Sequence, residues 1–136
     1  MTIRNIRWSW AIGGAVAVES ALLASAFLYM VLYSYWIHPG ENIAYYREYA
    51  KVSSPFVSLA AGIPFFYFAC RWIGGRIRTG ALRAAVALYV VYCAIEIPFM
   101  LTADNTALLF AAVSFPTKFL GAYLGGRAAG PRAQTA

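Results

Sequence analysis

Charged residues are scarce in this chain of 136 residues, where aspartate, glutamate, lysine and arginine together make up 12%. Soluble domains carry about twice that fraction. A water-soluble fold of this size would therefore lack the polar side chains that its surface needs. Apolar residues make up 62% of the chain, and a lipid environment accepts them without a polar coat. The composition excludes an ordinary soluble domain and favours one domain in a membrane.

Residues that carry metal or catalytic chemistry are also few. The chain has one histidine, His38, and its two cysteines, Cys70 and Cys93, lie in separate apolar segments. His38 and Glu41 lie in one turn, but two ligands are too few for a metal site. We find no Ser-His-Asp set, no HExxH and no glycine-rich phosphate loop. The sequence thus predicts no metal, no cofactor and no catalytic residue.

The net charge of +6 is basic, yet lysine and arginine interrupt the apolar runs instead of gathering in one place. Nucleic-acid binding needs basic residues clustered on one face, so we expect no nucleic-acid partner. Basic residues between apolar runs are typical of polytopic membrane proteins. Membrane lipids with anionic headgroups are the partners that this arrangement favours.

Four apolar runs are long enough to cross a membrane as helices, for which about 20 residues are needed. They cover residues 10–36, 54–72, 84–101 and 106–124. No alternating strand pattern accompanies them. We therefore predict an all-α integral membrane protein, a four-transmembrane-helix bundle that forms a single domain over residues 1–136.

The connection of residues 37–53 is the one sizeable loop between these spans. His38-Pro39-Gly40 should end the first helix, because proline cannot continue it and glycine permits a turn. Over residues 42–52, apolar and aromatic side chains recur on one helical face and charged side chains on the other. This pattern predicts a short helix lying in the outer membrane interface.

The distribution of basic residues predicts the orientation in the membrane. Eight of them fall in the two tails and around the loop after the second span, and two fall in the outer loop. The eight are Arg4, Arg7, Arg71, Arg76, Arg78, Arg83, Arg127 and Arg132, and the two are Arg47 and Lys51. The positive-inside rule then places both termini in the cytoplasm, and we expect a bacterial inner membrane.

A cleavable secretory signal is the competing interpretation of the N-terminus. Arg4 and Arg7 precede an apolar stretch, and the ASA sequence of Ala24–Ala26 resembles a cleavage site. The apolar run nevertheless continues beyond this site, and Glu19 interrupts it. We therefore favour a first span that is retained.

Three ionisable residues fall inside the predicted spans: Glu19, Glu96 and Lys118. With a helical rise of about 1.5 Å per residue, Glu19 and Lys118 lie at overlapping depths. A lone charge in lipid is costly, so we predict an intramembrane ion pair between Glu19 and Lys118. Such a pair either belongs to a functional site or fixes the helix register, and the sequence leaves both open.

Glu96 should lie nearer the outer face, without a cationic partner at its own level. Tyr89, Tyr92 and Cys93 share its helical stripe. In one interpretation Glu96 is in contact with water, or is protonated and bonded to a tyrosine. In the other, Glu96, Tyr92 and Tyr89 form a candidate proton or ligand site that lines a cavity. The outer position slightly favours the first interpretation.

Small residues form stripes on two of the spans. Gly121 and Gly125 share the stripe of Lys118, and Ser58 and Gly62 form a similar stripe on the second span. Such residues let helix backbones approach closely. We therefore predict helix packing at these four positions, and a homo-oligomer or a membrane protein partner is a further expectation.

The stretch GGAVAVE, from Gly13 to Glu19, resembles the first-helix motif of small multidrug resistance transporters. In that family a membrane-embedded glutamate binds both substrate and proton, and the resemblance implies this role for Glu19. The match covers seven residues. The long outer loop, Lys118 and the third and fourth spans depart from the family's pattern, so we assign the chain to no family.

The lack of chemical motifs favours a non-enzymatic membrane protein that acts through lipid or protein contacts. The alternative is a small oligomeric transporter or channel with Glu19, Lys118 and Glu96 along its path. An enzyme that acts on lipid is the third class, and it has the least support from the spacing of these residues.

Overall fold

The computed structural model describes residues 8–77, 80–101 and 105–129. Within these ranges the regular elements are helices: α1 (Trp8–Leu32), α2 (Ile43–Arg76), α3 (Ala81–Met100) and α4 (Asn105–Ala129). The π-helical turn η2 (Tyr33–Ile37) continues α1. All four long helices are apolar enough to cross a membrane. The prediction of an all-helical chain with four candidate spans is confirmed.

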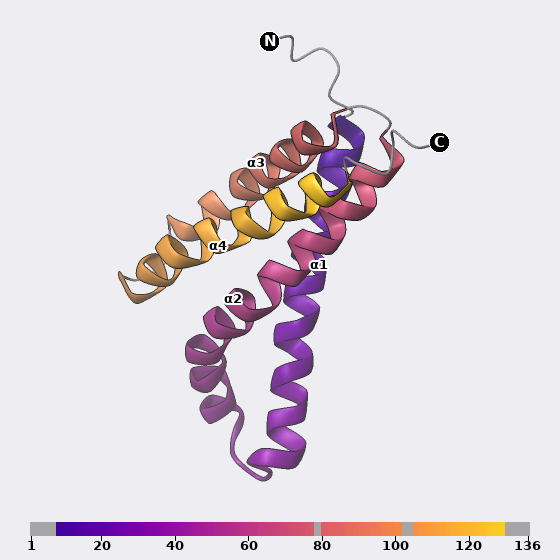
Figure 1. Cartoon of the computed structure of the whole chain (residues 1–136). Coiled ribbons are helices and arrows are strands. Elements are labelled where there is room, and N and C mark those ends of the chain that lie inside the picture. Colours follow the sequence, from indigo (N-terminus) through magenta and orange to yellow (C-terminus); the bar gives the residue numbers. More distant parts are fainter. Residues whose placement is uncertain (1–7, 78–79, 102–104, 130–136) are drawn as a thin grey trace.

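Helix α2 is longer than the sequence pattern predicts. It has 34 residues, which corresponds to about 51 Å of helix. Residues 43–53, which we assigned to an outer loop with a separate short helix, are continuous with the second span, so that part of the prediction is wrong. The side chain of Asn42 caps the start of α2 by accepting a hydrogen bond from the Tyr45 backbone N–H at 2.8 Å. Figure 1 shows that α2 curves along its length.

The turn between α1 and α2 is fixed by its backbone and by tyrosines. Gly40 has a φ of +90°, a conformation that side chains with a Cβ rarely adopt. The Tyr46 hydroxyl donates a hydrogen bond to the His38 carbonyl at 2.5 Å. The rings of Tyr33 and Tyr49 stack with their centroids 3.9 Å apart, and this contact ties the end of the first helical segment to α2.

The four helices converge at the end where α1 and α3 begin and α2 and α4 end (Figure 1). Helix α2 packs most extensively against α4, whereas α1 packs against α2 and α3. Toward the α1–α2 turn, α1 diverges from the α3–α4 pair. The buried core is rich in alanine, which allows close backbone packing. Its members are Ala11, Ala15, Val18, Leu22, Phe66, Cys70, Ile73, Ala84, Ala85, Ala87, Leu88, Tyr92 and Ala122.

Three glycines allow the close approach of α2 and α4. A Cβ at Gly121 would lie 2.6 Å from the carbonyl oxygen of Ile63, and one at Gly125 would overlap the backbone of Tyr67. A Cβ at Gly62 would lie 2.7 Å from Cε of Lys118. The α2–α4 contact is therefore backbone against backbone at two positions, and backbone against the lysine side chain at the third.

We expect Gly121→Ala to lower the free energy of unfolding by about 1–3 kcal/mol, because the added methyl group meets backbone atoms that cannot rotate away. Thermal or chemical unfolding in detergent measures this change. Gly75→Ala is the matched control, because a Cβ there would meet nothing within 4 Å and alanine is the better helix former. Equal stability of Gly121→Ala and Gly75→Ala would contradict the close contact.

Candidate functional site

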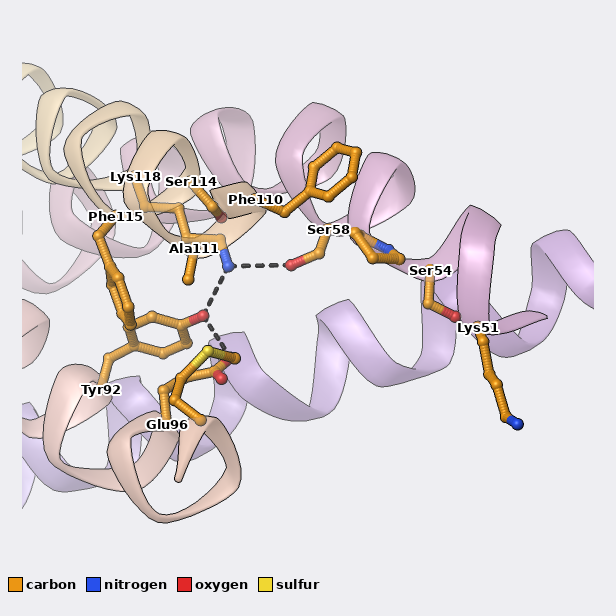
Figure 2. A pocket seen from close by; sticks show the side chains of 12 residues that line it. Lys51, Ser54, Ser58, Tyr92, Glu96, Phe110, Ala111, Ser114, Phe115 and Lys118 are labelled. Atoms are coloured by element: carbon orange, nitrogen blue, oxygen red, sulfur yellow. Dashed lines mark hydrogen bonds between the residues drawn. The ribbon is translucent and has the colours of Figure 1, made fainter. Parts of the chain in front are cut away.

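Lys118 lies near the middle of α4 and is the buried charged group at the centre of the site. Its side chain is 3% exposed and its aliphatic part crosses Gly62 of α2. The ammonium group donates hydrogen bonds to the Ser58 hydroxyl at 2.9 Å and to the Tyr92 hydroxyl at 2.6 Å. Figure 2 shows both contacts, which connect α4 to α2 and to α3.

Tyr92 connects Lys118 to Glu96 through its hydroxyl group. The Tyr92 hydroxyl donates a hydrogen bond to Oε1 of Glu96 at 2.6 Å, which the i,i+4 spacing on α3 permits. A tyrosine hydroxyl can accept one hydrogen bond while it donates another. The ring of Tyr92 is fully buried and packs edge-to-face against Phe66, with centroids 4.8 Å apart. Lys118, Tyr92 and Glu96 thus form a hydrogen-bonded chain, which we call the Lys118–Glu96 chain.

The Lys118–Glu96 chain lines a pocket of about 270 Å³ between α2, α3 and α4. Ser58 and Ser114 add hydroxyl groups beside Lys118, and Lys51 and Ser54 line the part nearer the start of α2 (Figure 2). The rest of the wall is mainly apolar: Pro55, Met100, Phe110, Ala111 and Phe115. The pocket therefore combines one buried positive charge, one carboxyl group and an apolar surface.

The predicted ion pair between Glu19 and Lys118 is not formed by direct contact. Among the described residues, one lysine–carboxylate pair lies within 4.0 Å. It is Lys51 and Glu48 on the surface of α2, at 2.7 Å. The physical reason is the order of the helices: α1 packs against α2 and α3, while α4 packs mainly against α2. Glu19 is still close enough to interact electrostatically with both Glu96 and Lys118.

Glu19 also has an unsatisfied polar atom. Its Oε2 is buried, and within the described part of the chain it has no hydrogen-bond partner. A buried carboxyl oxygen without a partner is costly while the group is charged. Glu19 therefore contributes to the electrostatic environment of the Lys118–Glu96 chain from the α1 side without being a member of it.

Glu96 has an indirect cationic partner, contrary to our expectation, because Tyr92 connects it to Lys118. Of the candidate residues Glu96, Tyr92 and Tyr89, the first two line the pocket. Tyr89 donates its hydroxyl hydrogen to the Phe115 carbonyl at 2.9 Å instead. The i,i+4 spacing of Tyr92 and Glu96 was a usable signal in the sequence. No comparable signal in the sequence indicated the hydrogen bond from Lys118 to Ser58, because it joins residues 60 positions apart.

The site offers no metal centre within residues 8–77, 80–101 and 105–129. No group of three His, Cys, Asp or Glu side chains gathers there. Both cysteines are free thiols, and Cys70 is buried in the core. The polar groups that the pocket wall offers are the ammonium group of Lys118, the carboxyl group of Glu96 and the hydroxyl groups of Tyr92, Ser58 and Ser114.

No family model matches the chain, and no curated protein or solved structure is significantly similar to it. The resemblance to small multidrug resistance transporters is limited to residues Gly13 to Glu19. The case for a function rests on the pocket and on the chain of hydrogen bonds that lines it.

We expect Tyr92→Phe to lower the free energy of unfolding by about 1–3 kcal/mol, because it leaves a buried ammonium short of an acceptor. Tyr35→Phe is the control, since Tyr35 is 74% exposed. The midpoints of thermal unfolding in detergent measure both effects. A Tyr92→Phe protein as stable as Tyr35→Phe would show that the hydroxyl does not bridge Lys118 and Glu96.

Proposed function

We propose that the protein is an integral membrane protein with both termini in the cytoplasm, in a bacterial inner membrane. The four long apolar helices support the membrane location. The end of α2 supports the orientation: the guanidinium of Arg76 lies 3.9 Å from the ring centroid of Trp72, near Trp10. Tryptophan and arginine side by side are typical of a membrane interface, and arginine favours the cytoplasmic one.

Within that membrane, the function that the site supports best is proton-linked transport of a small charged solute. The observation that carries the proposal is the position of the Lys118–Glu96 chain, in the wall of a pocket near the middle of α4. Ionisable groups inside transmembrane helices are costly and usually mark substrate or proton paths. A carboxyl group connected to a lysine through one hydroxyl can release or take up a proton as the charge in the pocket changes.

A complete route across the membrane would need more than one copy of the chain, so the proposed transporter is a homo-oligomer. The half of α1 nearest the α1–α2 turn diverges from α3 and α4 (Figure 1). It exposes large apolar side chains, among them Leu23 at 64% and Phe27 at 72%. The same face favours a second candidate function, contact with membrane lipids or with another membrane protein without transport.

We expect a charged solute to drive proton movement in proteoliposomes that contain the purified full chain and a trapped pH-sensitive dye. The probes are benzenesulfonate and benzyltrimethylammonium, which stay charged at every working pH and carry no proton through lipid unaided. One of them should drive proton movement, and Glu96→Gln should reduce it to the level of protein-free liposomes, because an amide binds no proton there. The membrane potential is clamped with potassium and valinomycin.

Glu41→Gln is the matched control for this experiment, because Glu41 is exposed in the α1–α2 turn. It should transport like the wild type. Proton movement that is absent with both probes, or unchanged in Glu96→Gln, would contradict transport at this pocket and leave the contact function as the better proposal.

A further inference from the structure

The charges inside the pocket indicate which kind of solute it accepts. Two lysines and one glutamate line the pocket. Lys51 is already paired with Glu48 on the surface, so Lys118 and Glu96 determine the charge of the interior. While Glu96 is ionised it balances Lys118 through Tyr92, and once Glu96 is protonated Lys118 is the charged group left in the pocket interior, with Glu19 acting on it only through space. The pocket is therefore complementary to an anion when Glu96 is protonated.

Lys118 also has the hydrogen-bonding capacity for an anion. An ammonium group has three donors, and within the described residues two of them are used, by Ser58 and Tyr92. The third donor remains for a ligand in the pocket. A cation is less favoured in this pocket, because Lys118 would repel a second positive charge nearby and Oε1 of Glu96 already accepts from Tyr92.

The size and the wall of the pocket limit the rest of the ligand. A volume of about 270 Å³ lies just below the range of about 300–1,000 Å³ of pockets for drug-sized ligands. Phe110, Phe115 and Met100 form an apolar wall on which a flat or compact apolar group can pack. Lys51 and Ser54 line the part nearer the start of α2, which favours entry of a soluble compound over a lipid chain.

We infer that this pocket binds a small, singly charged organic anion with a compact apolar body, with Lys118 as its anion-binding group and Glu96 as the proton carrier. The inference names the solute of the transporter proposed above and rests on that function. Each anion that binds Lys118 displaces the charge of Glu96, so one proton enters with each anion. The other titratable groups that act on Lys118 and Glu96 are Glu19 from α1 and Tyr92 and Cys93 from α3. Lys51 from α2 lines the same pocket.

The test is equilibrium binding by calorimetry, with the full chain in phosphatidylcholine nanodiscs. Three ligands differ in charge around one aromatic ring: benzenesulfonate, neutral benzenesulfonamide and cationic benzyltrimethylammonium. Benzenesulfonate should bind at least about tenfold more tightly than the other two, a difference of about 1.4 kcal/mol. Since one proton enters with the anion, its affinity should rise by up to about tenfold for each unit of pH decrease.

Variants separate the role of Lys118 from general damage to the fold. Lys118→Met should abolish binding of benzenesulfonate, and Ala111→Phe should do the same by filling the pocket while it leaves Lys118 in place. Ala112→Phe is the matched control, because the neighbouring Ala112 is exposed and lies outside the pocket wall. Glu19→Gln should tighten binding, because it removes a negative charge that acts on Lys118.

Four results would overturn the inference: equal binding of the sulfonamide, tighter binding of the cation, an affinity independent of pH, or loss of benzenesulfonate binding in phosphatidylglycerol nanodiscs. The last would assign the pocket to an anionic lipid headgroup. Failure of this inference differs from failure of the proposed function. If the anion binds but causes no proton movement in liposomes, the proposal of transport is wrong and the proposal of an anion-binding pocket stands. If only the cation drives proton movement, transport stands and the inference of an anionic solute is wrong.

Discussion

The ammonium group of Lys118 is the constraint on which the rest of the site depends. A charge buried among helices is costly unless it is paired and hydrogen-bonded. The chain meets this requirement from two other helices at once, with Ser58 of α2 and Tyr92 of α3. The lysine side chain can cross to them only because Gly62 leaves room beneath it and because Gly121 and Gly125 bring α4 close to α2. The close packing of α2 against α4 and the hydrogen bonding of the buried Lys118 ammonium group therefore depend on each other.

The same arrangement separates two roles that the three ionisable residues of the candidate spans could have shared. Lys118 and Glu96 are joined through Tyr92 and line the pocket. Glu19 lies outside the pocket wall and acts on them only through space. The proposed function follows from this difference: the carboxyl group that can exchange its charge with a ligand is Glu96, and Glu19 adjusts how readily it does so.

Much of the fold could be predicted from the sequence, because apolar runs of sufficient length specify helices on local grounds. The start of α2 could not be predicted in this way. We predicted that the second span begins at residue 54, yet α2 runs through this point with Pro55 inside it, because proline is tolerated within an apolar helix whose neighbours satisfy the freed backbone groups. For the site, the helical spacing correctly predicted that Tyr92 and Glu96 share one stripe. The depths estimated from the helical rise predicted that Glu19 lies at the level of Lys118. Which helices are neighbours depends on the packing of the whole bundle, and this order decided that Lys118 meets Tyr92 and not Glu19.

A pair of double-mutant cycles tests the central claim most directly, namely that Lys118 is coupled to Glu96 more strongly than to Glu19. The free energy of unfolding is measured for Lys118→Met, Glu96→Gln, Glu19→Gln and the two double variants that contain Lys118→Met. The Lys118/Glu96 cycle should give a coupling of about 1–3 kcal/mol, in the range of residues in one hydrogen-bond network, and the Lys118/Glu19 cycle a smaller one. Additive effects of Lys118→Met and Glu96→Gln, or a stronger coupling to Glu19, would contradict the Lys118–Glu96 chain.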